Sequence, residues 1–157
     1  MSKAMVFPGQ GSQSMGMQAD LAAEFSVVQE TYAEASDILG YDLWNVIQNG
    51  PVEKLSETVV TQPAMLTAGS AAYRVWLAAG GAPPQQAAGH SLGEYSALVA
   101  GESLSFSDAL IVVIERAKLM QDAVPAGVGA MAAIIGLDDA SVIAACDEAS
   151  SMGVAEP

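Results

Sequence analysis

The sequence predicts an α/β fold, in which short strands alternate with longer helices. Two short apolar segments, over 4–7 and 87–89, each run into a glycine-containing turn that is followed by a segment with helical spacing. The chain has 157 residues, of which 52% are hydrophobic, so it can bury a substantial core. A globular domain is therefore expected rather than a disordered segment.

The first half of the sequence predicts one strand followed by helices. The strand is expected over 4–7, and the helices over 15–40, 41–50 and 61–81. Gly40 is expected to end the first helix, and Gly80 the last. Pro63 is expected in the first turn of the last helix, where the N–H that proline lacks would have no partner anyway. Apolar residues on both faces of that helix predict that it is buried.

The second half predicts two further strand and helix pairs with a helix between them. A buried strand is expected to end at Gly89, and a short helix to follow as far as Gly101. The next helix is expected to begin at Ser105, which caps it with Asp108 three residues later, and to stop at Pro125. An apolar run over 127–137 then predicts a strand, and 138–153 predicts a helix that opens with acidic residues.

The last strand and helix are too few elements to form a domain by themselves. We therefore expect residues 1–125 to form the N-terminal part of a core, and residues 126–157 to be the start of an incomplete subdomain. The chain is interpreted as an N-terminal piece of a longer protein.

Composition argues against several classes of function. Eighteen acidic and five basic residues give a formal net charge of −13, so no nucleic-acid partner is expected. No apolar run is long enough to span a membrane, and Pro8 interrupts the N-terminus before a signal-peptide core could form. The single cysteine, Cys146, allows no internal disulfide, which favours a reducing cytoplasm. No Cys/His cluster indicates a metal site, and no cofactor is expected.

The stretch GHSLGEYSALVA has the spacing of a nucleophile elbow, G-x-S-x-G, in which a strand turns sharply into a helix and exposes a serine at the tip. Gly89 and Gly93 would permit the close crossing of strand and helix. Backbone N–H groups at the start of the helix could stabilise an oxyanion beside Ser91. The bare five-residue pattern fits an ordinary Gly-flanked turn about equally well.

Arg116 is expected in the middle of a helix among apolar residues, where a guanidinium is costly unless it meets an anion. A bound carboxylate is one natural partner. The alternatives are an ion pair with Glu115 or Asp108, or a side chain that reaches solvent. The glycine-rich FPGQGSQ segment near the N-terminus could be part of a functional site, but it also fits a plain β-turn.

Five motifs together resemble the malonyl-CoA:acyl carrier protein transacylases of bacterial fatty-acid synthesis. They are VFPGQGSQ (6–13), TQPA (61–64), GHSLGEYSALVAG (89–101), ERAKLMQ (115–121) and GAMAAIIGL (129–137). The resemblance covers nearly the whole chain but about the first half of a family member. It implies an α/β-hydrolase-like core with a parallel sheet and flanking helices, together with a small ferredoxin-like subdomain. Ala117 departs from the family, which commonly has glycine there.

The resemblance also implies roles for single residues. Ser91 would attack malonyl-CoA and hold malonate as an ester until the phosphopantetheine thiol of acyl carrier protein takes it. The oxyanion would be held by the backbone N–H groups of Leu92 and Gln10. Arg116 would grip the free carboxylate of malonate. Gln62 would line the pocket, although a helix-capping role explains it almost as well.

The base that activates Ser91 is not evident in the sequence. The only histidine, His90, is adjacent to Ser91, and neighbours on a strained turn project in different directions. His90 is therefore interpreted as a pocket-wall residue. The resemblance places the catalytic histidine downstream of Pro157, so a C-terminal half of the same protein is an expected partner, beside malonyl-CoA and acyl carrier protein.

Two other classes of function remain open at this point. A serine esterase of the α/β-hydrolase type would share the elbow, but it would explain neither Arg116 nor the FPGQGSQ segment. A non-catalytic fragment that only docks acyl carrier protein would need no reactive serine. Hydrolysis of neutral esters would favour the first, and binding of the carrier without chemical labelling of Ser91 would favour the second.

Overall fold

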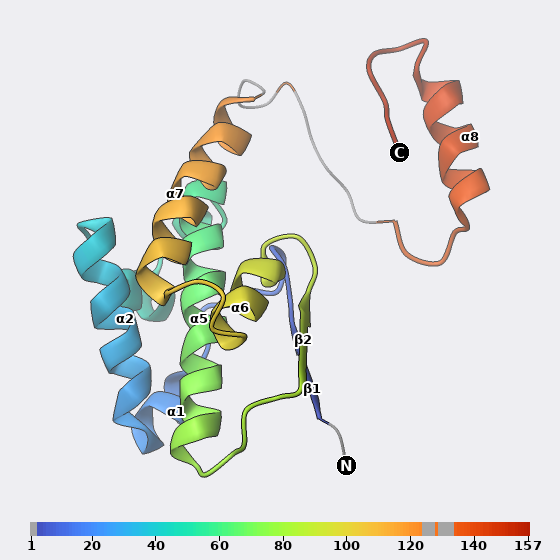
Figure 1. Ribbon diagram of the computed structural model, residues 1–157. Coiled ribbons are helices and arrows are strands. Elements are labelled where there is room, and N and C mark those ends of the chain that lie inside the picture. Colours follow the sequence, from blue (N-terminus) through green and yellow to red (C-terminus); the bar gives the residue numbers. More distant parts are fainter. Residues whose placement is uncertain (1–2, 124–127, 129–133) are drawn as a thin grey trace. The chain divides into compact units, whose positions relative to one another are not determined.

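A computed structural model describes residues 3–123, 128 and 134–157 of the chain (Figure 1). They belong to two compact units, Met1–Val124 and Pro125–Pro157. The predicted α/β class is confirmed, because the described residues are mostly helical and include a small parallel sheet. Among them, no helix is long and apolar enough to cross a membrane.

The sheet of the first unit consists, within the described residues, of β1 (Ala4–Phe7) and β2 (Gln86–Gly89). The two strands run parallel, with Phe7 opposite Gly89 (Figure 1). Carboxyl ends of parallel strands meet at the same edge of a sheet. The turn after β1, which contains Gln10, is thereby brought beside the turn after β2, which contains Ser91.

The helices of the first unit surround a long central helix, α5. They are α1 (Ala19–Glu24), α2 (Ser26–Leu39), α3 (Leu43–Asn49), α4 (Val52–Leu55), α5 (Thr58–Ala78), α6 (Gly93–Ala100) and α7 (Phe106–Asp122). Helix α5 packs against α2, α6 and α7 (Figure 1). Tyr32, Ile47, Leu66 and Leu110 are fully buried where these helices meet. Each such side chain contributes about 1.5–3 kcal/mol through burial. The predicted burial of α5 is confirmed.

Several helix signals in the sequence are confirmed. Gly40 ends α2 with a φ of 74°, a left-handed conformation that glycine adopts without steric cost. The Ser105 hydroxyl caps α7 by accepting a hydrogen bond of 3.1 Å from the backbone N–H of Asp108. Gly101 follows the last residue of α6, and α5 ends at Ala78, two residues before Gly80.

Other helix predictions were wrong. The segment 15–40 contains two helices, because Phe25 adopts an extended conformation between α1 and α2. Helix α4 was not predicted. Helix α5 begins at Thr58, so Pro63 lies inside the helix rather than in its first turn. Proline removes one backbone hydrogen bond there. Complete burial of Thr61 and Ala64 on either side of Pro63 shows that tertiary packing determines where this helix begins.

The strand before Ser91 was predicted to be buried, and this was wrong. Gln86 and Ala88 of β2 are exposed, and Ala87 and Gly89 are half-buried. Burial of a strand depends on what covers its two faces and its neighbouring edges. In the described part of the chain, β2 pairs with β1 and packs against α6.

The second unit contains α8 (Asp139–Ala149), which confirms the predicted helix. Asp138 caps it by accepting a hydrogen bond of 2.7 Å from the N–H of Ser141, and this bond lowers the pKa of the Asp138 carboxyl. Most of the predicted strand over 127–137 lies outside the described residues, as does the predicted stop at Pro125. The described part of that segment, 134–137, is not a strand.

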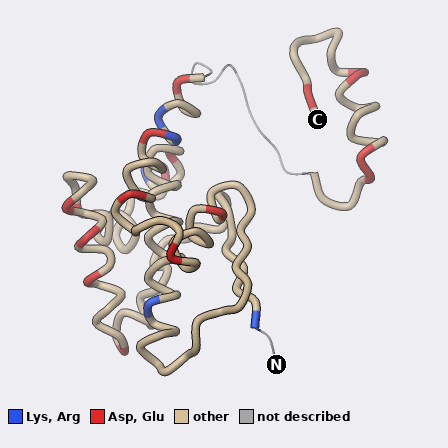
Figure 2. The backbone as a smooth tube through the Cα atoms, in the orientation of Figure 1, with Lys and Arg blue, Asp and Glu red and all other residues tan. Residues whose placement is uncertain are grey.

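Acidic residues are spread over the helices, whereas the basic ones are few (Figure 2). The five cations are Lys3, Lys54, Arg74, Arg116 and Lys118. Arg74 forms an ion pair of 2.8 Å with Glu34, and Lys118 one of 3.6 Å with Glu115. The overall charge of the chain therefore does not attract an anionic ligand over a distance.

Candidate active site

Ser91 lies at the tip of a strained turn between β2 and α6. Its φ is 52°, a left-handed conformation that residues other than glycine rarely adopt. The surrounding fold stabilises this strained conformation, because β2 before the turn and α6 after it are both fixed by packing against β1. The serine side chain is exposed at this tip. The strand, turn and helix of a nucleophile elbow are thus all present.

The two glycines of the elbow are required by the close approach of backbone segments. A Cβ at Gly89 would overlap the carbonyl group of Gly93, and a Cβ at Gly93 would overlap the backbone oxygen of Phe7. The helix therefore crosses both strands at a distance that only glycine permits. The G-x-S-x-G pattern has a steric cause in this chain, rather than being an accidental match to a short pattern.

Gly93→Ala is expected to destabilise the chain by about 1–3 kcal/mol, because the added methyl group meets backbone atoms that cannot rotate away. Urea denaturation of the purified chain measures the change. Gly101→Ala is the matched control, since the nearest contact of its Cβ, 3.3 Å to the Ala97 oxygen, is tight but much longer than the contact that a Cβ at Gly93 would make with the Phe7 oxygen. Equal stability of the two variants would contradict the steric explanation.

Four polar side chains from four parts of the first unit form a connected cluster. Arg116 on α7 donates from Nη2 to Ser91 Oγ at 2.9 Å and from Nη1 to Gln62 Oε1 at 2.6 Å. Gln62 on α5 donates from Nε2 to Gln10 Oε1 at 3.3 Å. The structure therefore brings together four residues that the sequence singled out from segments far apart in the chain.

The alternative partners considered for Arg116 are engaged elsewhere. Glu115 pairs with Lys118, and Asp108 accepts a hydrogen bond from the Ser105 hydroxyl. The Arg116 guanidinium instead lies half-buried at the serine, with its central carbon 5.8 Å from the centre of the Tyr95 ring. Its hydrogen bonds to Ser91 and Gln62 are both to neutral groups. No carboxylate among the described residues therefore neutralises this cation.

Gln62 does not cap a helix. It is fully buried in the second turn of α5, whose N-cap residue is Glu57. Its amide also contacts Met120 of α7, with Nε2 3.2 Å from the sulfur. Met120 was not predicted from the sequence, and neither was Thr58, whose hydroxyl accepts a hydrogen bond of 3.4 Å from Gln10 Nε2.

The turn after β1 lies close to the elbow. A Cβ built on Gly9 would stand 2.8 Å from the backbone oxygen of His90, so the two turns are in van der Waals contact through backbone atoms. Among the hydrogen bonds of the described residues, none uses the backbone N–H of Gln10 or Leu92. Neither N–H group is therefore occupied by another described hydrogen bond.

His90 is exposed, and no hydrogen bond joins its ring to Ser91 within the described part of the chain. The Ser91 hydroxyl contacts the Arg116 guanidinium instead, which has N–H donors and no acceptor atom. Residues 3–123 therefore place a serine hydroxyl and a cation together, and no described hydrogen bond joins that hydroxyl to a base.

Ala117 fits where the resemblance leads one to expect glycine. It is fully buried in α7, on a helix that packs against α5, and its methyl group belongs to the interior of the first unit. Alanine is the most favourable residue in the interior of a helix. The departure from the family pattern is accommodated in this structure.

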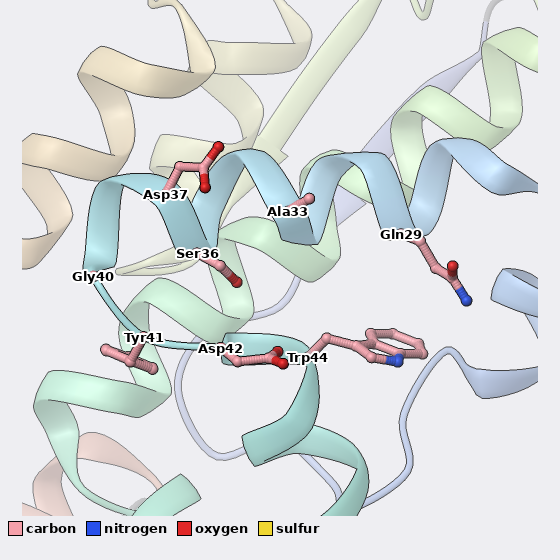
Figure 3. A pocket seen from close by; sticks show the side chains of 8 residues that line it. All are labelled: Gln29, Ala33, Ser36, Asp37, Gly40, Tyr41, Asp42 and Trp44. Carbon is pink, nitrogen blue, oxygen red and sulfur yellow. The ribbon is translucent and has the colours of Figure 1, made fainter.

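A separate hollow of about 620 Å³ lies between α2 and α3 (Figure 3). None of the residues that line it belongs to the polar cluster. Its lining includes Asp37, Asp42, Tyr41 and Trp44. Burial and the charge of Glu57 raise the pKa of Tyr41 to about 12. Two carboxylates would repel a negatively charged acyl group. The cluster around Ser91 is therefore the better candidate site.

The cluster borders a second hollow, of about 670 Å³, along the exposed side of α7. Arg116, Met120 and Glu115 line it together with the apolar side chains of Ile111, Val112 and Leu119. The Glu115 carboxylate pairs with Lys118. This arrangement gives a small organic group both an apolar surface and a cation. Residues 3–123, 128 and 134–157 contain no group of acidic, cysteine or histidine side chains suited to a metal ion.

Comparison with known proteins identifies the family. The family model described as acyl transferase domain matches residues 4–157. The chain is 60% identical over 154 residues to the malonyl CoA-acyl carrier protein transacylase of Escherichia coli (strain K12), covering 98% of this chain and 50% of that protein. The chain thus spans about half the length of the curated relatives that it matches.

Solved structures agree with this result. An acyl-carrier-protein S-malonyltransferase from Burkholderia pseudomallei 1710b aligns with a TM-score of 0.89 and 58% identity, covering 98% of this chain and 50% of that one. A malonyl-transacylase in complex with its type II PKS acyl-carrier protein aligns with a TM-score of 0.90 and 56% identity, covering 97% and 49%. This chain belongs to the acyl transferase domain family.

Proposed function

We propose that this chain supplies the nucleophile and the acyl-binding residues of a malonyl-CoA:acyl carrier protein transacylase. The observation that carries the proposal is the contact between the Arg116 guanidinium and Ser91 Oγ, at 2.9 Å. A serine at the tip of an elbow fits acyl transfer in general, whereas a cation at that serine fits an acyl group that bears a carboxylate. The names of the relatives agree with this substrate.

In the proposed reaction, Ser91 Oγ attacks the thioester carbonyl of malonyl-CoA. A base takes the serine proton and returns it to the departing CoA thiol, which leaves malonate as an ester on Ser91. The thiol of the phosphopantetheine arm of acyl carrier protein then attacks this ester and frees the serine. In both steps the negatively charged oxygen of the tetrahedral intermediate accepts hydrogen bonds from the N–H groups of Gln10 and Leu92. This role is supported by the closeness of the two turns and by the lack of other described hydrogen bonds from these groups.

Arg116 would provide selectivity for malonyl over acetyl groups. In a malonyl ester, only a few bonds separate the carboxylate from Oγ, so a guanidinium beside Oγ is within reach of it. The carboxylate would replace the neutral Ser91 oxygen as the acceptor and form charge-assisted hydrogen bonds, which are roughly twice as strong as neutral ones. The hydrogen bond from Nη1 to Gln62 fixes the plane of the guanidinium during this exchange.

We further propose that the base is a histidine in the other half of the protein. The complete enzyme then consists of this chain followed by a C-terminal half, as the relatives' length suggests. On this view the first unit is part of an α/β-hydrolase-like core, and residues 126–157 begin a ferredoxin-like subdomain. His90 forms part of the pocket wall. A cytoplasmic location and no cofactor beyond the two thiol carriers are in keeping with this function.

Arg116→Ala in the complete enzyme is expected to lower kcat/KM for malonyl-CoA by at least roughly tenfold, because hydrogen bonds to charged groups are worth about 1.5–3 kcal/mol each. The kcat/KM for acetyl-CoA is expected to stay level or rise, since an acetyl group leaves the half-buried cation unpaired. Steady-state transfer to acyl carrier protein measures both values in wild type and variant.

Lys118→Ala is the matched control for this comparison. Lys118 is an exposed cation on the same helix and pairs with Glu115 rather than with the site. Its removal should leave the ratio of malonyl to acetyl transfer unchanged. An equal loss of both activities in Arg116→Ala would show that Arg116 is structural, and the assignment of a malonyl substrate would then fail.

The two other classes of function make different predictions. A serine esterase would hydrolyse neutral esters faster than it transfers malonyl thioesters. A neutral ester, however, has no anionic group that could pair with the cation beside the serine. A docking fragment would bind acyl carrier protein while a serine-directed phosphonate left Ser91 unlabelled. The strained φ of Ser91 favours a reactive serine over this second class.

A further inference from the structure

We propose that Thr58, the first residue of α5, is a positioning residue that acts through Gln10 on the oxyanion site. The inference rests on the proposed function, because it assigns a role within the same acyl-transfer site. Thr58 contacts neither Ser91 nor Arg116 in the described hydrogen bonds, so its effect would be transmitted by another side chain.

The Gln10 side chain is held at both ends of its amide by one face of α5. Its Nε2 donates to Thr58 Oγ1 at 3.4 Å, and its Oε1 accepts from Gln62 Nε2 at 3.3 Å. Thr58 and Gln62 are four residues apart on the same helix, so they lie on one face, a single turn from each other. Each bond is long, and together they fix both the position and the orientation of the amide.

The turn that carries Gln10 needs such an anchor. Gly9 and Gly11 flank the residue, and Gly11 has a φ of 103°, so the backbone on both sides has the wide conformational freedom of glycine. Apart from the bonds to the Gln10 side chain, the described side-chain contact of this turn is a bond of 2.8 Å from the Gly11 N–H to Gln13 in the same loop. The two bonds to α5 therefore tie the loop to the core.

The orientation of this turn matters because a backbone N–H stabilises an oxyanion only when it points at that oxygen. The backbone N–H of Gln10 must point to where the charge develops, and a displacement of about 1 Å is enough to cost much of its effect. A side chain that holds Gln10 in place therefore influences the rate of ester formation without touching the substrate. The side-chain amide of Gln10 connects this backbone N–H group to α5 through its two hydrogen bonds.

Thr58 is better suited to this role than to starting the helix. The N-cap position is occupied by Glu57, which makes no side-chain capping bond, and the Thr58 hydroxyl is used by Gln10 instead. Threonine is also one of the weaker helix formers. Gln62, the other anchor, holds Arg116 as well, so its removal would disturb two functions at once. A substitution of Thr58 therefore affects the positioning of the oxyanion donor without affecting carboxylate binding.

The experiment compares Thr58→Val and Thr58→Ser in the complete enzyme. Valine keeps the shape of threonine but cannot accept the bond from Gln10, whereas serine can. The readout is the rate of Ser91 acylation by malonyl-CoA in a single turnover without acyl carrier protein. Thr58→Val is expected to lower the maximal rate by about threefold to tenfold, the loss of one hydrogen bond. The malonyl-CoA concentration for half-maximal rate should not change, and Thr58→Ser should retain the wild-type rate.

Two controls separate positioning from a merely structural effect. Ser56→Ala removes a hydroxyl that bonds to Val52 within its own segment, and it should leave the rate unchanged. In a Gln10→Ala background, Thr58→Val should cause no further loss, because the side chain through which it acts is already gone. The melting temperatures of Thr58→Val and Thr58→Ser should agree with that of the wild type.

The outcomes distinguish this inference from the proposed function. If the wild type acylates Ser91 and Thr58→Val does so at the same rate, the inference is overturned and the proposed function stands. An equal slowing by Thr58→Val with and without the Gln10 side chain would overturn it as well, as would a slow Thr58→Ser enzyme. If the wild-type complete enzyme forms no ester on Ser91, both the inference and the proposed function fail.

Discussion

Residues 1–157 alone are expected to transfer malonate from malonyl-CoA to acyl carrier protein about a hundredfold to ten-thousandfold more slowly than the complete enzyme, the range over which a general base accelerates proton transfer. The physical reason is the surroundings of Ser91. Its hydroxyl contacts the Arg116 guanidinium, which cannot accept a proton, and the His90 ring forms no hydrogen bond to it. The sequence of this chain holds no other histidine.

The measurement is a transfer assay with the purified chain, before and after addition of a C-terminal half. That half can be the protein's own or the matching part of the Escherichia coli relative, whose first half is 60% identical to this chain. Addition should restore transfer, and a chain that carries Ser91→Ala should not respond. Rapid turnover by residues 1–157 alone, dependent on Ser91, would contradict the proposal and make His90 the candidate base.

Much of the candidate site was predictable from local patterns. The G-x-S-x-G spacing predicts the elbow because Gly89 and Gly93 are fixed by backbone contacts that lie within a few residues or across one strand pair. The start of α7 was predictable for a similar reason, since Ser105 and Asp108 form their capping bonds within one turn. Patterns of this kind depend on neighbours in sequence, so the sequence alone reveals them.

The contacts that define the chemistry are of another kind. Arg116 is 25 residues from Ser91 and 54 from Gln62, and Gln10 is 48 from Thr58. No periodicity in the sequence encodes a hydrogen bond over such a separation. The sequence therefore left Gln62 open between a cap and a pocket residue, and it gave no sign of Thr58 or Met120. The resemblance to a known family pointed to Arg116, and the structure shows how the residue is held.

The errors in the fold have the same origin. Pro63 was expected in a first helical turn because local preference favours it there, but the buried residues around it continue α5 back to Thr58. The expected burial of β2 depended on neighbours of the sheet, which the sequence pattern does not specify. In the first case the predicted start of the helix was wrong, and in the second the predicted burial of the strand was wrong, but both elements are present.

The central claim is that Ser91 carries malonate as an ester beside Arg116, and trapping that ester tests it most directly. Complete enzyme is mixed with malonyl-CoA in the absence of acyl carrier protein, quenched in acid, digested and analysed by mass spectrometry. Ser91→Ala removes the proposed nucleophile, and Ser103→Ala, which removes an exposed hydroxyl just after α6, serves as the matched control.

The proposal predicts a single malonyl group on the peptide that contains Ser91, assigned to Ser91 by fragmentation. The group should be absent from Ser91→Ala, present in Ser103→Ala, and lost when acyl carrier protein with its phosphopantetheine arm is added. Malonate on a different residue, or transfer to the carrier that persists in Ser91→Ala, would contradict the account.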